Sequence, residues 1–417
     1  MKKYPKYKDS GISWLGQIPE HWEVKRIASL FKNNFDVNKD FEYKHAFKFN
    51  YGALVPKNEI GSESEYKDTY VKYTILSKDD IVINGLNLNY DFVSQRVAIA
   101  PTNGIITSAY VAIKPKQSTY SDYYLYVLKT MDGMKMFHSM GTGIRLTLSY
   151  DELKKQLLPI PPHNEQQKIV EFLESKISKI NSYVLERERE LQVLTELKQS
   201  QIAEVVTKGI NPNVPMKDSG ISWIGQIPAH WSVSKISDIF TERREKVSDK
   251  EYQALSVSKQ GITLQLDSAV KTDNGDNRKK VCVGDFVVNS RSDRKGSCGV
   301  SQFDGSVSLI NIVLQPRKEL CGQFFHYLFR SNNYIEEFYR LGRGIVADLW
   351  TTRYSEMKNI YIPIPPREEM EQIVHFIEDK CQSIDSMISN LEAEIAYLKE
   401  YKQSLIADAV TGAINVQ

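Results

Sequence analysis

Two polar loops contain the side chains best suited to contact a nucleic acid. One follows a strand-like run and ends in basic residues, namely Asn289, Arg291, Arg294 and Lys295. The other follows the apolar residues Ile81–Ile83 and is rich in amides, with Asn84, Asn87, Asn89 and Tyr90. Cations neutralise phosphates, while arginine and asparagine can form paired hydrogen bonds with base edges. Both loops therefore predict DNA contacts, although a solvated surface, or the preference of turns for asparagine, would explain the same residues.

Further candidates lie outside these loops. Arg145 and Arg343 occur in glycine-rich segments, from which they could reach a phosphate. The remaining candidates are single residues or small basic clusters: Lys48, Asn50, Tyr51, Arg96, Arg243, Arg244, Arg278, Lys279 and Lys280. For each of them a solvated face is the alternative interpretation.

Signatures of catalysis are weak by comparison. The run Gly342–Ala347 fits a dinucleotide fingerprint, but it follows an aromatic helical stretch and not the strand that such a site requires. The sequence contains neither a phosphate-binding G-x-x-x-x-G-K-[ST] loop nor an H-E-x-x-H zinc motif. The cysteines form no C-x-x-C pair, which predicts free thiols and no metal site: Cys282, Cys298, Cys321 and Cys381. We therefore predict a non-enzymatic chain.

The chain is built from an internal repeat. Lys8–Trp22 returns as Lys217–Trp231, with 13 of 15 positions identical. Leu158–Pro162 returns as Ile362–Pro366, and the match continues into the residues that follow. The middles of the two copies, residues 32–118 and 241–316, share little. This pattern predicts two similar scaffolds that carry two different binding surfaces. Because they recur in both copies, Trp14, Trp22, Trp223 and Trp231 are predicted to be buried anchors and not stacking platforms.

A long helix is predicted after each Pro-Pro pair. In both copies apolar residues alternate at spacings of three and four, which is the a/d pattern of a coiled coil. This heptad seam comprises Val170, Leu173, Ile177, Ile180, Val184, Leu191 and Leu194 in the first copy, and Val374, Ile377, Cys381, Ile384, Ile388, Leu391, Ile395 and Leu398 in the second. Arg187 interrupts the first seam at the position equivalent to Leu391, where we expect a polar layer or a side chain that extends to solvent.

These observations predict an α+β fold in which two globular α/β heads are joined by two long antiparallel coiled-coil helices. The predicted division is a first head at 1–162, a first helix at 163–208, a linker at 209–215, a second head at 216–365, a second helix at 366–411 and a tail at 412–417. An approximate two-fold axis between the copies would place the heads at opposite ends of the helix pair.

Composition is compatible with many partners. The chain has 417 residues and a formal net charge of only +2, so overall charge gives no support for nucleic-acid binding. No apolar run is long enough to span a membrane, and polar sequence follows Met1–Tyr4. These features predict a cytoplasmic protein without a secretory signal.

The repeated phrase Asp-Ser-Gly-Ile-x-Trp-x-Gly-x-Ile-Pro-x-His-Trp resembles the opening of type I restriction-modification specificity subunits. Pro-Ile-Pro-Pro followed by Glu165-Gln166 and Ile169-Val170 adds to this resemblance, which covers essentially the whole chain. The second copy departs from the pattern at Met370, where the first copy has Gln166.

The resemblance implies a DNA-recognition subunit in which each head reads one half of a bipartite, asymmetric site in double-stranded DNA. It also implies two bound methylation subunits and, through that complex, restriction subunits with motor and nuclease activity. S-adenosylmethionine, ATP and Mg would then be needed only by those partners. Two alternatives stay open: a coiled-coil scaffold whose heads bind proteins instead of DNA, and a nuclease or methyltransferase in its own right.

Overall fold

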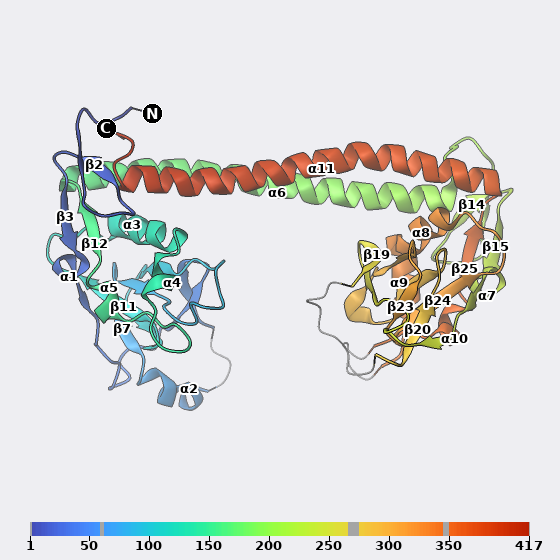
Figure 1. Cartoon of the computed structure of the whole chain (residues 1–417), viewed down its shortest axis with the longest axis horizontal. Coiled ribbons are helices and arrows are strands. Elements are labelled where there is room, and N and C mark those ends of the chain that lie inside the picture. Colours follow the sequence, from blue (N-terminus) through green and yellow to red (C-terminus); the bar gives the residue numbers. More distant parts are fainter. Residues whose placement is uncertain (1, 59–61, 266–274, 345–349, 417) are drawn as a thin grey trace. The chain divides into compact units, whose positions relative to one another are not determined.

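The computed structural model describes residues 2–58, 62–265, 275–344 and 350–416, and it divides the chain into two compact units. The first unit comprises Met1–Arg187 together with Ala393–Gln417, and the second comprises Glu188–Glu392. Each unit therefore contains one head and about half of each long helix (Figure 1).

An antiparallel sheet with the strand order β4-β11-β8-β9 forms the centre of the first head. Its strands are β4 (Phe31–Asn33), β11 (Val111–Pro115), β8 (Ile81–Ile83) and β9 (Val97–Ile99). Antiparallel pairs surround it: β1 (Tyr7–Asp9) with β2 (Gln17–Pro19), β3 (Glu23–Arg26) with β12 (Leu157–Ile160), β5 (Phe47–Asn50) with β6 (Ala53–Pro56), and β7 (Thr74–Leu76) with β10 (Gly104–Ile106). The head's helices are α1 (Ile27–Leu30), α2 (Glu63–Tyr70), α3 (Ser121–Gly133), α4 (Met136–Met140) and α5 (Tyr150–Leu153).

The second head repeats this plan with the sheet order β16-β24-β21-β22. These strands are β16 (Phe240–Glu242), β24 (Asn311–Pro316), β21 (Phe286–Asn289) and β22 (Cys298–Val300). The other strands are β13 (Met216–Asp218), β14 (Gln226–Pro228), β15 (Ser232–Lys235), β17 (Lys246–Val247), β18 (Leu255–Ser258), β19 (Gly261–Leu264), β20 (Arg278–Val281), β23 (Gly305–Val307) and β25 (Tyr361–Ile364). Its helices are α7 (Ile236–Ile239), the 3-10 turn η1 (Ser292–Arg294), α8 (Gly322–Arg330), α9 (Asn332–Arg340) and α10 (Tyr354–Met357).

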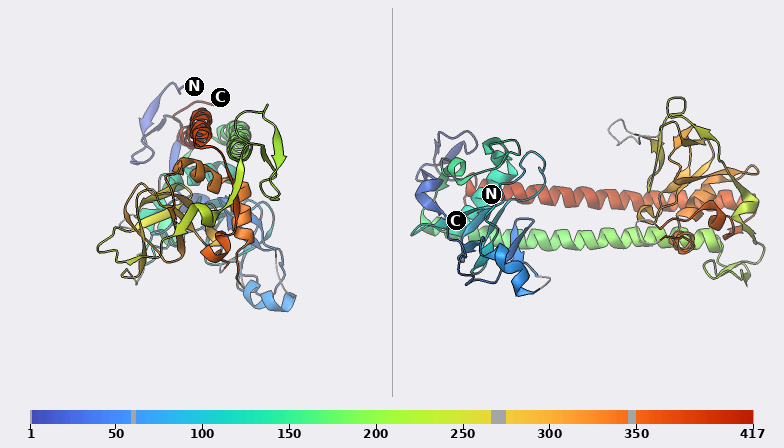
Figure 2. Two further views of the ribbon diagram at one scale, coloured as in Figure 1. Left: turned by 90° about the vertical axis from the view of Figure 1, so that its right-hand side faces the viewer. Right: turned by 90° about the horizontal axis from the view of Figure 1, so that it is seen from below.

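The two long helices are α6 (His163–Lys208) and α11 (Arg367–Val410), and they run antiparallel. In the first unit the start of α6 shares a buried core with the end of α11, through Leu173 and Leu405 among others. In the second unit the end of α6 shares a core with the start of α11, as Val206 and Ile373 show. Figure 1 and Figure 2 show the helices side by side. The predicted α+β fold with two antiparallel long helices is therefore confirmed.

The heptad seam lies inward in both helices. Each predicted seam residue is buried or half-buried, and the neighbouring helix positions are mostly exposed. Arg187 is half-buried, and its guanidinium lies 4.8 Å from the centre of the Tyr183 ring. An aromatic face stabilises a cation at that distance, which accounts for an arginine within an apolar seam.

A glycine with a left-handed backbone follows each long helix. Gly209 has φ +74° and Gly412 has φ +77°, the conformation that most often ends a helix. A side chain at Gly412 would collide with Pro19, because a Cβ atom there would lie 2.4 Å from the proline ring. Lys2 and Asn415 are bridged, so the two ends of the described chain lie close together in the first unit (Figure 2).

Candidate DNA interface

The repeated tryptophan segment clamps the start of each long helix. In the first unit, Trp22 Nε1 donates a hydrogen bond of 3.0 Å to Glu165 Oε2, and His21 Nε2 lies 2.8 Å from the same oxygen. Glu165 is buried, so these contacts replace the water that its carboxylate loses. The predicted burial of Trp22 is confirmed, since its side chain is fully enclosed.

The second unit has the same clamp. Trp231 Nε1 donates a 3.0 Å hydrogen bond to Glu369 Oε2, and His230 Nε2 lies 2.7 Å from that oxygen. The sequence alone did not predict that these glutamates have tryptophan and histidine partners. The clamp explains why the segment is repeated: it holds each head on its helix and leaves the middle of the copy free to differ.

Two of the predicted contact segments meet in the first head. The Leu148 amide donates to the Gly85 carbonyl oxygen at 2.9 Å, and the Leu88 amide donates to Leu146 at 3.1 Å. The loop after β8 is therefore bonded to the glycine-rich segment that carries Arg145. Because Arg145 is exposed beside this loop, candidates about 60 residues apart in the sequence share one surface.

The turn between β5 and β6 joins the same surface. A Cβ atom on Gly52 would lie 2.7 Å from Gln95 Oε1, so the turn packs directly against the end of the loop after β8. Tyr51 in this turn has φ +44° and its side chain is 80% exposed. A bulky residue in the left-handed region is strained, and such residues concentrate at functional sites.

We call this combined area the first reader surface. It consists of the β5–β6 turn, the loop 84–95 and the segment 142–145. Its exposed residues include large apolar side chains beside Arg145 and amides, namely Tyr51, Tyr90, Phe92, Val93 and Ile144. Lys48, Asn50 and Asn87 are also exposed, while Asn84 and Asn89 are half-buried. Amides and apolar side chains are the groups that contact adenine and the thymine methyl group in the major groove.

Arg96 was predicted as a DNA contact, and the structure corrects this. Its side chain is 1% exposed and its guanidinium faces the loop from inside. Nη1 donates to the carbonyl oxygens of Asn84 and Leu86 at 3.0 and 2.9 Å, and Nη2 donates to that of Asp91 at 2.7 Å. Arg96 therefore shapes the loop by binding its backbone and is not available to a ligand.

The second head joins the equivalent segments. The Thr352 amide donates to the Ser290 carbonyl oxygen at 3.0 Å, and the Ser292 amide donates to Trp350 at 3.0 Å. Arg343 and Thr351 also exchange backbone hydrogen bonds of 2.9 and 3.0 Å. The loop after β21 thus lies against the segment that carries Arg343, in the arrangement found in the first head.

We call the residues 289–295 with Arg343 the second reader surface. Arg343 and Arg294 have side chains that are 85% and 67% exposed. Arg291 is ion-paired with Asp293 at 3.0 Å, and Lys295 with Glu336 at 3.0 Å. Asn289 is half-buried, and its side-chain oxygen accepts the Arg291 amide at 3.1 Å. This surface is dominated by arginine, the side chain that most often pairs with guanine.

The basic clusters of the second head have mixed positions. Arg278 is buried and donates to Ser306, so its prediction as a DNA contact is wrong. Lys280 pairs with Glu245 at 2.9 Å, while Lys279 and Arg244 both pair with Glu242.

A buried aspartate supports the central sheet of each head. Asp285 forms a two-pronged pair with Arg243, whose Nε and Nη2 lie 2.7 and 3.1 Å from the carboxylate, so Arg243 has a structural role. The first head has Asp80, which accepts hydrogen bonds from the Ser77 amide and Asn34. Burial raises the pKa of Asp80 to about 6.

Some exposed cations near these surfaces were missed. Lys246 and Arg353 are exposed in the second head, and Lys259 lies in the β18–β19 turn that corresponds to the β5–β6 turn. The signal was present in the repeat alignment, since Arg353 stands where the first copy has Ser149. Within either copy alone, Lys259 and Arg353 are isolated cations.

Signs of other chemistry are limited. Within the described ranges, no group of three or more His, Cys, Asp or Glu side chains is placed to hold a metal ion. The run Gly342–Ala347 lies partly outside the described residues. No helix in the described part of the chain is both long and apolar enough to cross a membrane.

Comparisons with known proteins agree on one family. Residues 19–192 match the model of the type I restriction modification DNA specificity domain. The specificity subunit of the type I restriction enzyme MjaVIII from Methanocaldococcus jannaschii is 23% identical, over 96% of this chain and 95% of that protein. The EcoBI specificity subunit from Escherichia coli is 23% identical over 65% of this chain and 61% of that protein.

The fold is also shared with a solved structure. A chain from a structural study of complex assembly and conformational transition of the type I R-M system superimposes with a TM-score of 0.65. The superposition covers 94% of this chain and 98% of the other at 13% identity, so it concerns the fold alone. The family model, the relatives and the paired antiparallel helices all lead to one conclusion: over nearly its whole length this chain is similar to the DNA specificity subunits of type I restriction-modification systems.

Proposed function

We propose that this chain reads a bipartite, asymmetric site in double-stranded DNA, with one half-site for each head. The observation that carries the proposal is that equivalent loops converge in both heads but present different side chains. The first reader surface is amide-rich and aromatic, and the second is arginine-rich. Matched scaffolds with unlike readers favour two different half-sequences over a palindrome.

Helix length supports a gap between the half-sites. In this proposal the α6–α11 pair fixes the distance between the readers, because a helix rises about 1.5 Å per residue and a coiled coil resists bending. DNA readers with paired half-sites commonly span a helical turn of roughly 34 Å. The number of unread bases between the half-sites would then depend on the length of the helices and not on the reader surfaces.

Methylated bases across the host genome, mapped with and without this gene, would test the proposal. We expect a motif of two short, unlike half-sites separated by a fixed number of unread bases. The motif should disappear when the gene is removed. A continuous or palindromic motif would contradict the proposal. If no motif depends on the gene and the purified complex binds no DNA, the scaffold whose heads bind proteins becomes the better explanation.

We also propose that two methylation subunits bind along the helix pair. Three exposed apolar side chains on α6 recur at equivalent positions on α11: Tyr183 and Met387, Val193 and Tyr397, Leu197 and Tyr401. Exposed apolar residues at repeated positions are typical of a surface that binds two copies of one partner. Restriction subunits would join through those copies, and S-adenosylmethionine, ATP and Mg would be bound by the partners.

Val193→Glu is expected to displace one of the two methylation subunits, because a buried carboxylate at an apolar interface would lose its hydration. Native mass spectrometry of the purified complex would report the stoichiometry. Tyr397→Glu should displace the other copy, and the double variant should lose both. Ser389→Glu places the same charge at an exposed polar position on α11 and should leave two copies bound. Two copies on the double variant would exclude these positions as the docking surface.

A further inference from the structure

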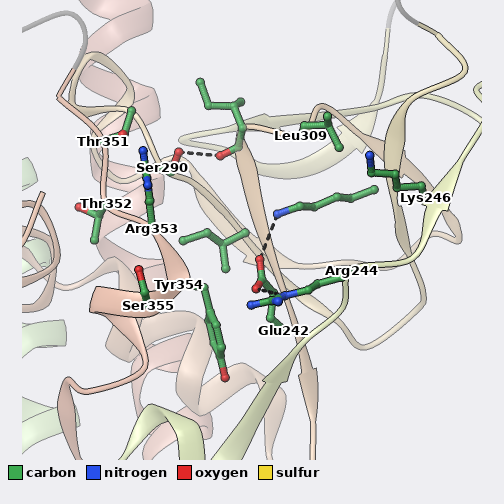
Figure 3. Close-up of a pocket in the computed structure, with 13 residues that line it drawn as sticks. Glu242, Arg244, Lys246, Ser290, Leu309, Thr351, Thr352, Arg353, Tyr354 and Ser355 are labelled. Carbon is green, nitrogen blue, oxygen red and sulfur yellow. Dashed lines mark hydrogen bonds and ion pairs between the residues drawn. The ribbon is translucent and has the colours of Figure 1, made fainter. Parts of the chain in front are cut away.

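A charged cleft lies beside the second reader surface. It has a volume of about 550 Å³ and is lined by β16, β17 and the segment 351–355. Among its described lining residues, the charged side chains are one carboxylate and four cations, namely Glu242 with Arg244, Lys246, Lys279 and Arg353. Figure 3 shows Arg353 and Thr352 on one side, with Arg244 and Lys246 on the other. The cleft therefore carries a net positive charge.

Only part of this charge is neutralised within the head. Glu242 lies 2.7 Å from Arg244 Nε and 3.1 Å from Lys279 Nζ, so one carboxylate serves two cations. In the described part of the head, no carboxylate lies within ion-pair distance of Lys246 or Arg353. Both side chains are exposed. They are thus available to an anion that enters the cleft.

The cleft and the second reader surface share a wall. Thr351 lines the cleft and is also paired through its backbone with Arg343 and bridged to Arg291. Ser290 lines the cleft at the base of the reader loop, where its carbonyl oxygen accepts the Thr352 amide. A strand of DNA on the reader surface would therefore pass the mouth of the cleft.

The first head has no such charge at the equivalent positions. When the two heads are aligned by their strands and by the segment before each long helix, the five charged residues of the cleft correspond to uncharged residues of the first head. The pairs are Glu242 with Asn33, Arg244 with Phe35, Lys246 with Val37, Lys279 with Thr74, and Arg353 with Ser149. Two backbone pairings support this alignment, since Val37 is bridged to Thr74 as Lys246 is paired with Lys279. Tyr150 and Tyr354, which follow Ser149 and Arg353, also donate to equivalent carbonyl oxygens, those of Phe31 and Phe240.

We propose that the cleft of the second head binds a backbone phosphate of the DNA beside the second half-site, through Lys246 and Arg353. The first head holds its half-site without this contact. The inference rests on the proposed function. It adds that the two heads differ in their affinity for the DNA backbone, as well as in the base sequence that each one reads. Phosphate contacts position DNA but carry no sequence information, so the cleft anchors the duplex and leaves base choice to the reader surfaces.

The salt dependence of DNA binding tests this proposal. The chain, assembled with its methylation subunits, would be titrated with a labelled duplex that contains the mapped site, at 50 and 200 mM salt. Each phosphate contact changes the affinity by about threefold over that range, because binding releases about one counterion per contact. We expect the double variant Lys246→Gln, Arg353→Gln to lower the ratio of the two affinities by about threefold, because the cleft holds a single phosphate, and each single variant to lower it by less. The methylated motif should stay the same.

Controls separate the possible outcomes. Lys318→Gln removes another exposed cation of the second head and should leave the ratio unchanged, as should Val37→Gln and Ser149→Gln in the first head. Normal DNA binding with an unchanged ratio in the double variant would overturn the cleft proposal and leave the proposed function intact. Absence of DNA binding by the unmodified complex would overturn the proposed function itself. A last measurement follows the acylation of Lys246 at constant ionic strength. If millimolar inorganic phosphate protects Lys246 and the duplex does not, the ligand is a free phosphate and not DNA.

Discussion

Inserting one heptad into both long helices is expected to lengthen the spacer between the half-sites by about three base pairs. Seven residues add about 10 Å of helix, and B-DNA rises about 3.4 Å per base pair. Suitable points are after Glu190 in α6 and after Glu392 in α11, because the first unit ends at Arg187 on α6 and the second ends at Glu392 on α11. A full heptad keeps the seam in register, so neither reader surface changes and both half-sites should be retained.

Methylome mapping of the lengthened variant would report the spacer directly. Insertion into α6 alone is the matched control, because it displaces one seam against the other and should lower the melting temperature without producing a new motif. An unchanged spacer in the double insertion would show that the helices do not set the separation. Loss of one half-site alone would instead indicate that the insertion disturbed the adjoining head.

Much of the fold could be predicted because it depends on local periodicity and on the repeat. The alternation of three and four residues marks both helices, and α6 runs from His163 to Lys208 because a Pro-Pro pair precedes it and Gly209 ends it. The antiparallel arrangement of the helices could be predicted because an approximate two-fold axis can relate two similar copies in one chain. The clamp between Trp22 and Glu165 joins residues 143 positions apart, and no local pattern reveals such a pairing.

The candidate site was harder to predict, since residue type does not report burial. Arg96 and Arg278 read as contacts because arginine is common at DNA interfaces, but both are enclosed by backbone or hydroxyl acceptors. Lys246 and Arg353 were overlooked because each is an isolated cation in the sequence. Their significance appears only when the fold brings them to one cleft and the first head supplies uncharged counterparts.

The repeat suggests how a single chain could acquire new specificities. The longest matches between the copies lie in the segment that carries the helix clamp and in the strand that leads into each long helix, while the middles of the copies, which carry the loops after β8 and β21, share little. Loops on a rigid scaffold tolerate change at little cost in stability. A head can therefore be altered at its reader surface without disturbing the helix pair, provided that the residues shaping its loops are kept.

Arg96→Gln is expected to abolish recognition of the first half-site and to leave the second intact. The substitution removes donors that bind the carbonyl oxygens of Asn84, Leu86 and Asp91, and those groups would be left without partners. The loop 84–95 would then lose its shape, and the first unit should lose about 3 kcal/mol of stability, as when a buried charged group is removed from its partners. DNA binding would be measured on duplexes altered in one half-site at a time.

A control must separate the loss of the loop from a general loss of stability. Met131 is fully buried on α3, so Met131→Ala should destabilise the first unit by about 2–5 kcal/mol. This variant should still discriminate the first half-site at a temperature where it is folded, because its loop contacts are intact. Arg145→Gln should weaken DNA binding by the loss of a single contact and should leave the stability of the first unit unchanged. If Arg96→Gln and Met131→Ala lose discrimination to the same extent, Arg96 supports the fold in general and does not shape the reader.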